Sequence, residues 1–482
     1  MKFRTSKTDG YVTVYCSLTF MVLLSLIFLL TEGARTNGAR FMSEYAVDIG
    51  MDSVLAEYHR ELFEKYDILS VDTSYGRGEP SLQKTAEHMQ NYVDHNLAIR
   101  GVVSLFGSGD LFKLRAYEVS PLNASYLTDG YGEVFRRQAE EERMQMLGLR
   151  AASEFLGFDD KDVSSMEEGK YDSMRESTEQ GINAARNTKI KISEDEYEYV
   201  EVNNPADGVN SKRGTGVLVL ALKDTSEISK AKVDLESRLE KRAINLGVGV
   251  NYLKHGNETY KDKLLFKDYI NTYFGCYGEE YEDSFLRYEK EYILVGKDSD
   301  LENLKGVANR LFAIRETSNI EYLFANAGKR AAIKTVATTV SAISALPWLE
   351  PLIEYSVLFG WAFAETVADM RCLYKGGKVP LVKTDASWKT DLDSALSNVF
   401  LDYEGESGGE GLDYEDYLQG LLLMQDINEQ SVRALDIVEL TIRQTPGNAG
   451  FRIDGCVDGV TLKTVITSNY GDEFSLTRDL YY

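Results

Sequence analysis

The sequence has 482 residues and a formal net charge of −24, with 43% hydrophobic and 27% charged residues. A chain of this length and apolar content buries a core, as one large domain or as two to three smaller ones. Its acidity argues against nucleic acid as a partner, because phosphate binding requires clustered lysine and arginine.

Residues 11–30 (YVTVYCSLTFMVLLSLIFLL) contain no formal charge, proline or glycine. At about 1.5 Å per residue, a helix of this length crosses the hydrocarbon core of a bilayer. Lys2, Arg4 and Lys7 precede it and favour a cytoplasmic N-terminus. No Ala-x-Ala-like cleavage signal follows. We therefore expect a retained single-pass anchor in the cell membrane, with the bilayer as a partner and most of the chain extracytoplasmic.

The helical pattern continues beyond this anchor. Apolar residues recur at steps of three and four as far as residue 69. This predicts one helix over residues 11–69, and two helices with a kink near residues 33–38 are the alternative. The apolar stripe of this helix is expected to pack on other such helices or on the protein's own outer domain. Its candidate packing residues are Ala34, Gly38, Met42, Ala46 and Ile49.

The rest of the chain predicts an α+β fold, mostly helical, with short antiparallel strands and a C-terminal β hairpin. A strand is expected over residues 111–119 and should end at Ser120-Pro121. Residues 331–370 predict a hairpin of helices, either buried or in contact with the membrane. The expected segments are a leader (1–10), the anchor (11–31), an amphipathic stalk (32–70), an α+β region (71–216), a helical region (217–404), a linker (405–411), a helical hairpin (412–445) and strands (446–482).

No motif of known chemistry is present in the sequence. There is no HExxH, GxSxG, GxxxxGK[ST] or strand-linked GxGxxG pattern. Cys276, Cys372 and Cys456 follow no zinc or CxxC spacing, so we expect reduced core residues, with one disulfide as the alternative. No catalytic residue, cofactor or metal ligand is predicted, and we expect the protein not to be an enzyme. A ligand-binding or sensing module and a membrane-tethered hydrolase with paired carboxylates are the alternatives.

The N-terminal region resembles a known class of bacterial membrane proteins. The sequence GYVTV from Gly10, the apolar run, EGAR ending at Arg35, and the stretch MDSVLAEYHRELFEKYDIL are similar to TadE/TadG-type pseudopilins. A closer resemblance is to an uncharacterised family of single-pass proteins from Gram-positive bacteria, a domain of unknown function. The stretches that carry it are EYHRELFEKYDIL (57–69), EYILVGKDSDLENLKGVANRLFAIRE (291–316), GWAFAETVADMRCLYKGGKVPL (360–381), LDYEDYLQGLLLM (412–424) and RALDIVEL (433–440).

The resemblance implies a membrane-anchored, pseudopilin-like envelope protein. Such a protein would be a structural or assembly component of a tight-adherence-like pilus or secretion system, with other subunits of that system as partners. It also implies a processing site after Gly10, because prepilin peptidases cut after a glycine that follows a basic leader. The fifth residue after Gly10 is Tyr15, where such substrates usually carry glutamate. Processing after Gly10 is therefore a hypothesis.

Overall fold

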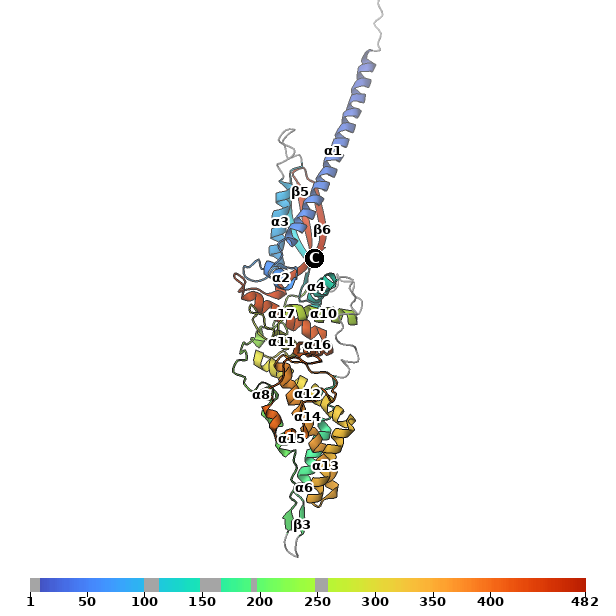
Figure 1. Cartoon of the computed structure of the whole chain (residues 1–482). Coiled ribbons are helices and arrows are strands. Elements are labelled where there is room, and N and C mark those ends of the chain that lie inside the picture. The colour runs from blue at the N-terminus through green and yellow to red at the C-terminus, as the bar shows by residue number, and fades with distance from the viewer. Residues whose placement is uncertain (1–8, 99–111, 148–165, 192–196, 248–258) are drawn as a thin grey trace, which may run out of the picture. The chain divides into compact units, whose positions relative to one another are not determined.

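The computed structural model describes residues 9–98, 112–147, 166–191, 197–247 and 259–482. These residues form two compact units (Figure 1). Unit 1 consists of Met1–Gln138, Ile244–Gly256 and Ile442–Tyr482, and unit 2 consists of Ala139–Ala243 and Asn257–Thr441. Each unit is therefore built from segments that are distant in the sequence.

Unit 1 combines long helices with an antiparallel sheet. Strand β5 is central, with β2 along one edge and β6 and β1 along the other. Its elements are α1 (Asp9–Leu55), α2 (Arg60–Tyr66), β1 (Val71–Asp72), α3 (Leu82–Leu97), β2 (Leu114–Tyr126), most of the first half of α4 (Asp129–Leu147), the 3-10 helix Ile453–Gly455, β5 (Cys456–Ser468) and β6 (Glu473–Tyr481). The predicted C-terminal β hairpin is confirmed.

The prediction that a strand ends at Ser120-Pro121 is wrong. Strand β2 continues through Pro121 to Tyr126, and its pairing with β5 shifts register after Pro121. Proline lacks a backbone N–H and is tolerated in a strand only at an edge or a bulge. Since β2 pairs only with β5 among the described strands, its other edge loses no ladder bond at Pro121.

The prediction of one helix to residue 69 is also wrong at its C-terminal end. Helix α1 is continuous through residues 33–38 but ends at Leu55. His59 then adopts an extended conformation, donates its backbone N–H to Ser70 O and caps α2 by accepting a hydrogen bond from Leu62 N. Residues 56–59 therefore connect α1 to a separate, capped helix.

The second half of α1 is part of the core of unit 1. Ala46, Val47, Met51 and Val54 are buried with residues of α3 and of the sheet. A Cβ atom at Gly50 would lie 2.9 Å from Met89 Sδ of α3, so the glycine permits a close approach of the two helices. The expected stalk therefore packs on its own unit.

Two charged contacts also tie α1 to the β5–β6 hairpin. Arg35 lies 2.9 Å from Asp472, and its guanidinium carbon is 4.5 Å from the centre of the Tyr470 ring. Further along the helix, Asp48 pairs with Arg478 at 2.7 Å. The folded part of unit 1 therefore begins five residues after Leu30.

Unit 2 is mostly helical. Its elements are α6 (Asp172–Arg186), β3 (Lys189–Lys191), β4 (Tyr197–Tyr199), α7 (Asp207–Asn210), the 3-10 helix Ser211–Thr215, α8 (Val217–Leu222), the 3-10 helix Leu235–Ser237, α10 (Tyr260–Tyr273), α11 (Glu289–Val295), α12 (Asp300–Ala325), α13 (Ala327–Ile343), the 3-10 helix Pro347–Leu349, α14 (Glu350–Tyr374), α15 (Leu392–Leu396), the 3-10 helix Val399–Asp402, α16 (Tyr414–Met424) and most of α17 (Ile427–Arg443). The predicted α+β class is confirmed.

In the apolar region 331–370, helix α14 is buried in unit 2, whereas α13 buries only Ile333, Ala337 and Ser341. Helices α13 and α14 pack together, and α14 is buried at every residue from Ser356 to Tyr374. α14 also contacts α12, α6 and α8, which surround it within unit 2. Cys276, Cys372 and Cys456 are buried, as expected of core residues.

Candidate functional site

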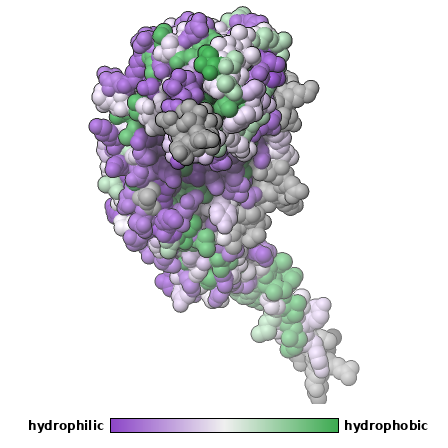
Figure 2. Space-filling view, turned by 90° about the horizontal axis from the view of Figure 1, so that it is seen from below, coloured by the Kyte–Doolittle hydropathy of each residue, from purple (hydrophilic) through white to green (hydrophobic). Residues whose placement is uncertain are grey.

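The first candidate site is the N-terminal half of α1. Among the described residues, α1 is the one helix long and apolar enough to cross a membrane, and its most apolar stretch is entirely uncovered by the protein. Its side chains form a projecting hydrophobic surface (Figure 2). Such a surface is unfavourable in water, because burial of apolar area is the main driving force of folding.

The predicted packing residues of α1 do not share one environment. Ala34 is exposed and Ala46 is buried in unit 1, while Gly38, Met42 and Ile49 are partly buried. Gly10, the hypothetical processing site, lies exposed in the first turn of α1. The predicted packing residues therefore include both an outward-facing residue, Ala34, and one that packs within unit 1, Ala46.

The outward face of α1 carries aromatic residues that the sequence pattern did not single out. Phe41 and Tyr45 are 66% and 50% exposed, and their rings stack with centroids 6.4 Å apart. At about 100° per residue, Cys16, Ala34, Phe41 and Tyr45 fall within about 40° of one another around the helix. An apolar face thus extends from the uncovered half of α1 along the half that packs on unit 1.

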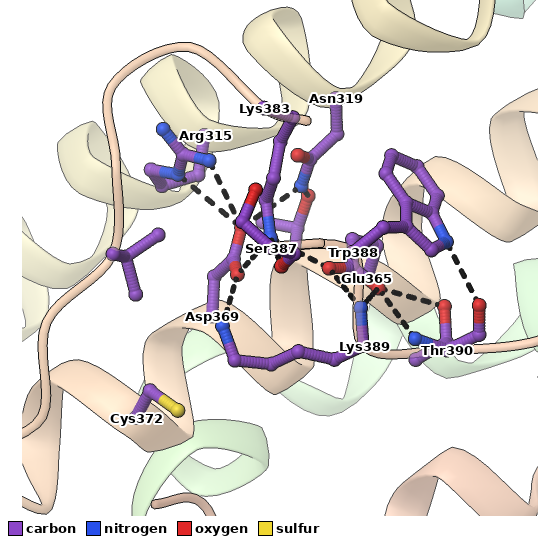
Figure 3. Close-up of polar contacts among 12 residues, drawn as sticks. Arg315, Asn319, Glu365, Asp369, Cys372, Lys383, Ser387, Trp388, Lys389 and Thr390 are labelled. Carbon is purple, nitrogen blue, oxygen red and sulfur yellow. Dashed lines mark hydrogen bonds and ion pairs between the residues drawn. The ribbon is translucent and has the colours of Figure 1, made fainter. Parts of the chain in front are cut away.

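The second candidate site is a group of buried charges in unit 2, centred on α14. Glu365 and Asp369 are one turn apart on this helix and are fully buried. Their partners come from α12 and from the loop after α14. Figure 3 shows the side chains of Arg315, Lys383 and Lys389 directed toward these carboxylates.

Lys383 contacts both carboxylates at once. Its Nζ lies 2.6 Å from Glu365 Oε1 and 2.6 Å from Asp369 Oδ1, and all three side chains are 0% exposed. Glu365 also accepts hydrogen bonds from the backbone N–H groups of Lys389 and Thr390 and from the Thr390 hydroxyl. The loop is therefore held to α14 by one lysine and by two backbone donors.

Asp369 Oδ2 is held from the other side by α12. Arg315 donates to it from Nε at 3.3 Å and from Nη2 at 3.1 Å, and Asn319 Nδ2 donates at 3.2 Å. Lys389 Nζ lies 3.3 Å from Asp369 Oδ1. Burial alone would raise the pKa of Asp369, but Lys383 and Arg315 hold that pKa below its usual range.

A further cation of α14 donates its hydrogen bonds to backbone carbonyl oxygens, and Glu404 and Asp402 also act on it electrostatically. The side chain of Arg371 is buried and donates to the backbone oxygens of Leu220, Phe400, Leu401 and Tyr403 at 2.6–3.3 Å. Its guanidinium thus connects α14 to α8 and to the segment that follows α15.

Two more carboxyls of unit 2 are buried on α11. Glu289 accepts a hydrogen bond from Gly275 N at 2.7 Å, and Glu291 accepts from Tyr277 N at 2.9 Å and from the Tyr414 hydroxyl at 2.8 Å. The second oxygen of each has no hydrogen-bond partner among the described residues. Burial raises the pKa of both carboxyls to about 7.

Unit 2 also contains a cavity of about 240 Å³ between α6, α8, α12 and α14. Phe312 and Phe363 supply apolar walls, and Arg175, Arg213 and Glu316 supply polar ones. Arg213 Nη2 lies 2.5 Å from Glu316 Oε1, and the guanidinium lies over the Phe363 ring. The cavity therefore has both apolar and polar walls, and Arg213 already occupies one ring face and one carboxylate in it.

Comparison with known protein families matches residues 195–468 to DUF5702, a family of unknown function. The match covers more than half of the chain. The chain belongs to the DUF5702 family. No curated protein and no solved structure matches it. The DUF5702 match includes the charges around α14 and four of the five stretches on which the predicted family resemblance was based, whereas α1 and the stretch 57–69 lie before it.

The buried charges around α14 were not predicted as a site. One signal was present, since Glu365 and Asp369 stand four residues apart in an otherwise apolar segment. Charges in such a segment require partners when the segment is buried. The identity of those partners was not predictable, because Arg315 is 54 residues from Asp369 in sequence.

Proposed function

We propose that this protein is a membrane-anchored, pseudopilin-like envelope component that assembles through lateral packing of α1. In this proposal the leader is cytoplasmic, unit 1 and unit 2 are extracytoplasmic, and the partners are subunits of a tight-adherence-like pilus or secretion system. The observation that carries the proposal is the continuity of α1. One unbroken helix has an uncovered apolar half and a second half built into a folded unit.

The exposed face of α1 supports lateral assembly. Phe41 lies about 16 Å beyond Leu30 along the helix axis, which is farther than the headgroup layer extends. Lipid therefore covers residues 11–30 but leaves Phe41 and Tyr45 uncovered. A second helix that crosses the same membrane beside α1 would cover both parts of this face at once.

Native Cys16 provides the test of lateral packing. It is exposed on α1, whereas the other three cysteines are buried. We expect copper–phenanthroline oxidation of membranes to give a disulfide-linked product, either a homodimer or an adduct with a neighbouring subunit, that Cys16→Ser abolishes. In the Cys16→Ser background, Phe41→Cys should restore a cross-link. Arg40→Cys is the matched control, because the Arg40 side chain is also 66% exposed but lies about 100° away around the helix.

The outcome that contradicts assembly is equally clear. If wild type and Phe41→Cys both remain monomeric after oxidation in native membranes, the outward face of α1 has no helical partner. If Phe41→Cys and Arg40→Cys cross-link equally, the contact is random collision. Labelling of Tyr481→Cys by a membrane-impermeant maleimide on whole cells tests the orientation, and its protection would place the folded units inside the cell.

The cavity in unit 2 supports a second candidate function, an extracytoplasmic ligand-binding module. Phe312, Phe363 and the paired Arg213 and Glu316 give it both apolar and polar walls. A screen of small molecules by thermal shift would test this. Stabilisation by a ligand that Phe312→Ala abolishes would favour a binding role over a purely structural one.

A further inference from the structure

Lys383, Asp369 and Glu365 are the components of an amide-forming reaction. The amine nitrogen of Lys383 is 2.6 Å from an oxygen of each carboxyl, and no solvent reaches the three side chains. Lys383 Nζ also donates to Ser387 O at 3.0 Å, which fixes the position of the amine. The site therefore holds a nucleophile, a carboxyl carbon and a second carboxyl that can carry protons.

We propose that Lys383 and Asp369 join in an intramolecular isopeptide bond, with Glu365 as the catalytic residue. Glu365 takes a proton from the Lys383 ammonium and passes it to Oδ1 of Asp369, and the free amine then attacks Cγ of the neutral carboxyl group. Glu365 next passes a second proton from Nζ to Oδ1, which leaves as water. A C–N bond forms, a C–O bond breaks, one hydrogen stays on the amide nitrogen, and Glu365 ends as it began. No oxidant or other reactant is required.

The residues around Asp369 suit the addition step. When the amine adds to Cγ, negative charge concentrates on Oδ2, the oxygen that remains. Arg315 and Asn319 already place three N–H donors on Oδ2, at 3.1–3.3 Å. Preorganised donors of this kind stabilise the oxyanion of acyl transfer. The leaving oxygen Oδ1 has the other set of contacts, to Lys383 and Lys389.

Burial favours the product over the ion pair. An ammonium and a carboxylate lose their hydration in an interior of low dielectric constant, whereas a neutral amide loses much less. The bond would leave Arg315 with the amide oxygen, Pro380 O, Leu381 O and the Tyr417 hydroxyl as acceptors. Arg371 shows that carbonyl oxygens can supply the hydrogen bonds of a buried guanidinium in unit 2, where the carboxylates of Glu404 and Asp402 also act on it electrostatically.

Lys383 is the nucleophile that the geometry selects. Lys389 also faces Asp369, but its Nζ is 3.3 Å from Oδ1 and its side chain is 15% exposed. The contacts of Lys389 with Glu365 are made by its backbone N–H and not by its amine. Lys378→Met is the control, because this 44% exposed lysine of the same loop pairs with Asp413 outside the site.

Mass spectrometry of the full-length protein purified in detergent tests the proposal. Digestion should yield one branched peptide joining Lys383 to Asp369, lighter than the sum of its two parts by one water. Glu365→Gln keeps an oxygen acceptor for Lys389 and Thr390 but carries no proton, so it should yield the two separate peptides. Lys378→Met, outside the site, should retain the branched peptide.

The peptide map of the wild-type protein tests for the isopeptide bond even if a variant does not fold. Recovery of Lys383 and Asp369 in separate, unmodified peptides from folded wild-type protein would overturn the proposal and leave an ion pair. A branched peptide that persists in Glu365→Gln would overturn the role of Glu365. A branch at Lys389 in place of Lys383 would overturn the choice of nucleophile. None of these outcomes depends on the membrane role proposed above.

Discussion

Arg371 shows how single residues hold unit 2 together. Its buried guanidinium donates to four backbone carbonyl oxygens from segments that are distant in sequence. Buried carbonyl groups that lose their donors retain the full cost of leaving water. The loss of Arg371 would therefore be costly mainly because four buried carbonyl oxygens would be left without a hydrogen-bond donor.

Replacement of Arg371 by methionine should destabilise the protein strongly. We expect Arg371→Met to lower the free energy of unfolding by roughly 2–5 kcal/mol, because several buried acceptors lose their partner together. Urea denaturation of the full chain in detergent measures this change. Arg310→Met is the control, since Arg310 pairs with Glu168 at the surface and should change stability by less than about 1 kcal/mol. Equal effects of the two substitutions would contradict the role of Arg371.

The buried carboxyls of α11 predict an unusual dependence of stability on pH. Burial raises the pKa of Glu289 and of Glu291 from 4.5 to about 7 in the folded state. The folded protein therefore binds these protons more tightly than the unfolded chain does. Their contribution to stability is fully present below about pH 4.5 and is lost as pH rises toward 7, on the order of 3 kcal/mol for each group.

Thermal unfolding between pH 5 and pH 8 should detect this dependence. We expect the Tm of unit 2 to fall as pH rises over this range and Glu291→Gln to flatten the profile, because glutamine is neutral at every pH. Glu282→Gln, at an exposed position of the same unit, should leave the slope unchanged. A profile that rises with pH in wild type would contradict the raised pKa values.

At the residue scale, Glu365 and Asp369 were visible in the sequence as charges in an otherwise apolar segment, but their contacts were not predicted. A charge in such a segment is unfavourable in lipid or in a protein core unless it is paired. The partners of Glu365 and Asp369 were hidden, since Lys383 lies in a loop with no periodic pattern and Arg315 lies on another helix. Long-range pairing of buried charges depends on tertiary packing, which no local pattern encodes.

Among the elements, α1 is defined by what its two halves contact. Its N-terminal half was predictable, because twenty apolar residues form a signal that depends only on composition and length. Its end at Leu55 was not predictable, because the apolar period continues beyond it into α2. The helix ends where contacts of the folded unit replace helical hydrogen bonds, since Leu55 O accepts from the Tyr482 hydroxyl and His59 N donates to Ser70 O. Pro121 was also not predictable from local sequence, because a proline is tolerated there only if β2 is an edge strand.

The packing of α1 on α3 should be sensitive to a side chain at Gly50. A Cβ atom there would lie 2.9 Å from Met89 Sδ and 3.0 Å from Val93 Cγ2. We expect Gly50→Leu to destabilise unit 1 by about 1–3 kcal/mol through overpacking. Gly33→Leu on the same helix is the control, because a Cβ at Gly33 meets nothing within 4 Å. Denaturation followed by the fluorescence of a probe on unit 1 would compare them, and a stable Gly50→Leu would contradict the close packing.

For the whole molecule, the decisive property is whether α1 lies in lipid. Leu23 and Leu26 are uncovered and near the middle of the apolar run. Each arginine at such a depth costs about 2.5–3.5 kcal/mol of insertion free energy. The double variant Leu23→Arg and Leu26→Arg should therefore lose resistance to alkaline carbonate extraction of membranes.

Phe41→Arg provides the matched control for this prediction. It adds a charge to the same helix at an exposed position outside the apolar run, so the variant should stay in the membrane fraction. Extraction of the wild-type protein by carbonate without detergent would contradict the anchor itself. Retention of the double arginine variant would show that another part of the chain contacts the membrane.

The contacts of Arg35 with Asp472 and Tyr470 couple the orientation of α1 to that of the β5–β6 hairpin. Only five residues, about 7 Å of helix, separate these contacts from the end of the apolar run. A long flexible linker would let the folded unit rotate independently of a membrane helix. Residues 31–35 are helical and short, so they do not allow such rotation. In the proposed anchoring, a tilt of residues 11–30 would turn the β5–β6 hairpin by the same angle, because Arg35 connects the helix directly to that hairpin.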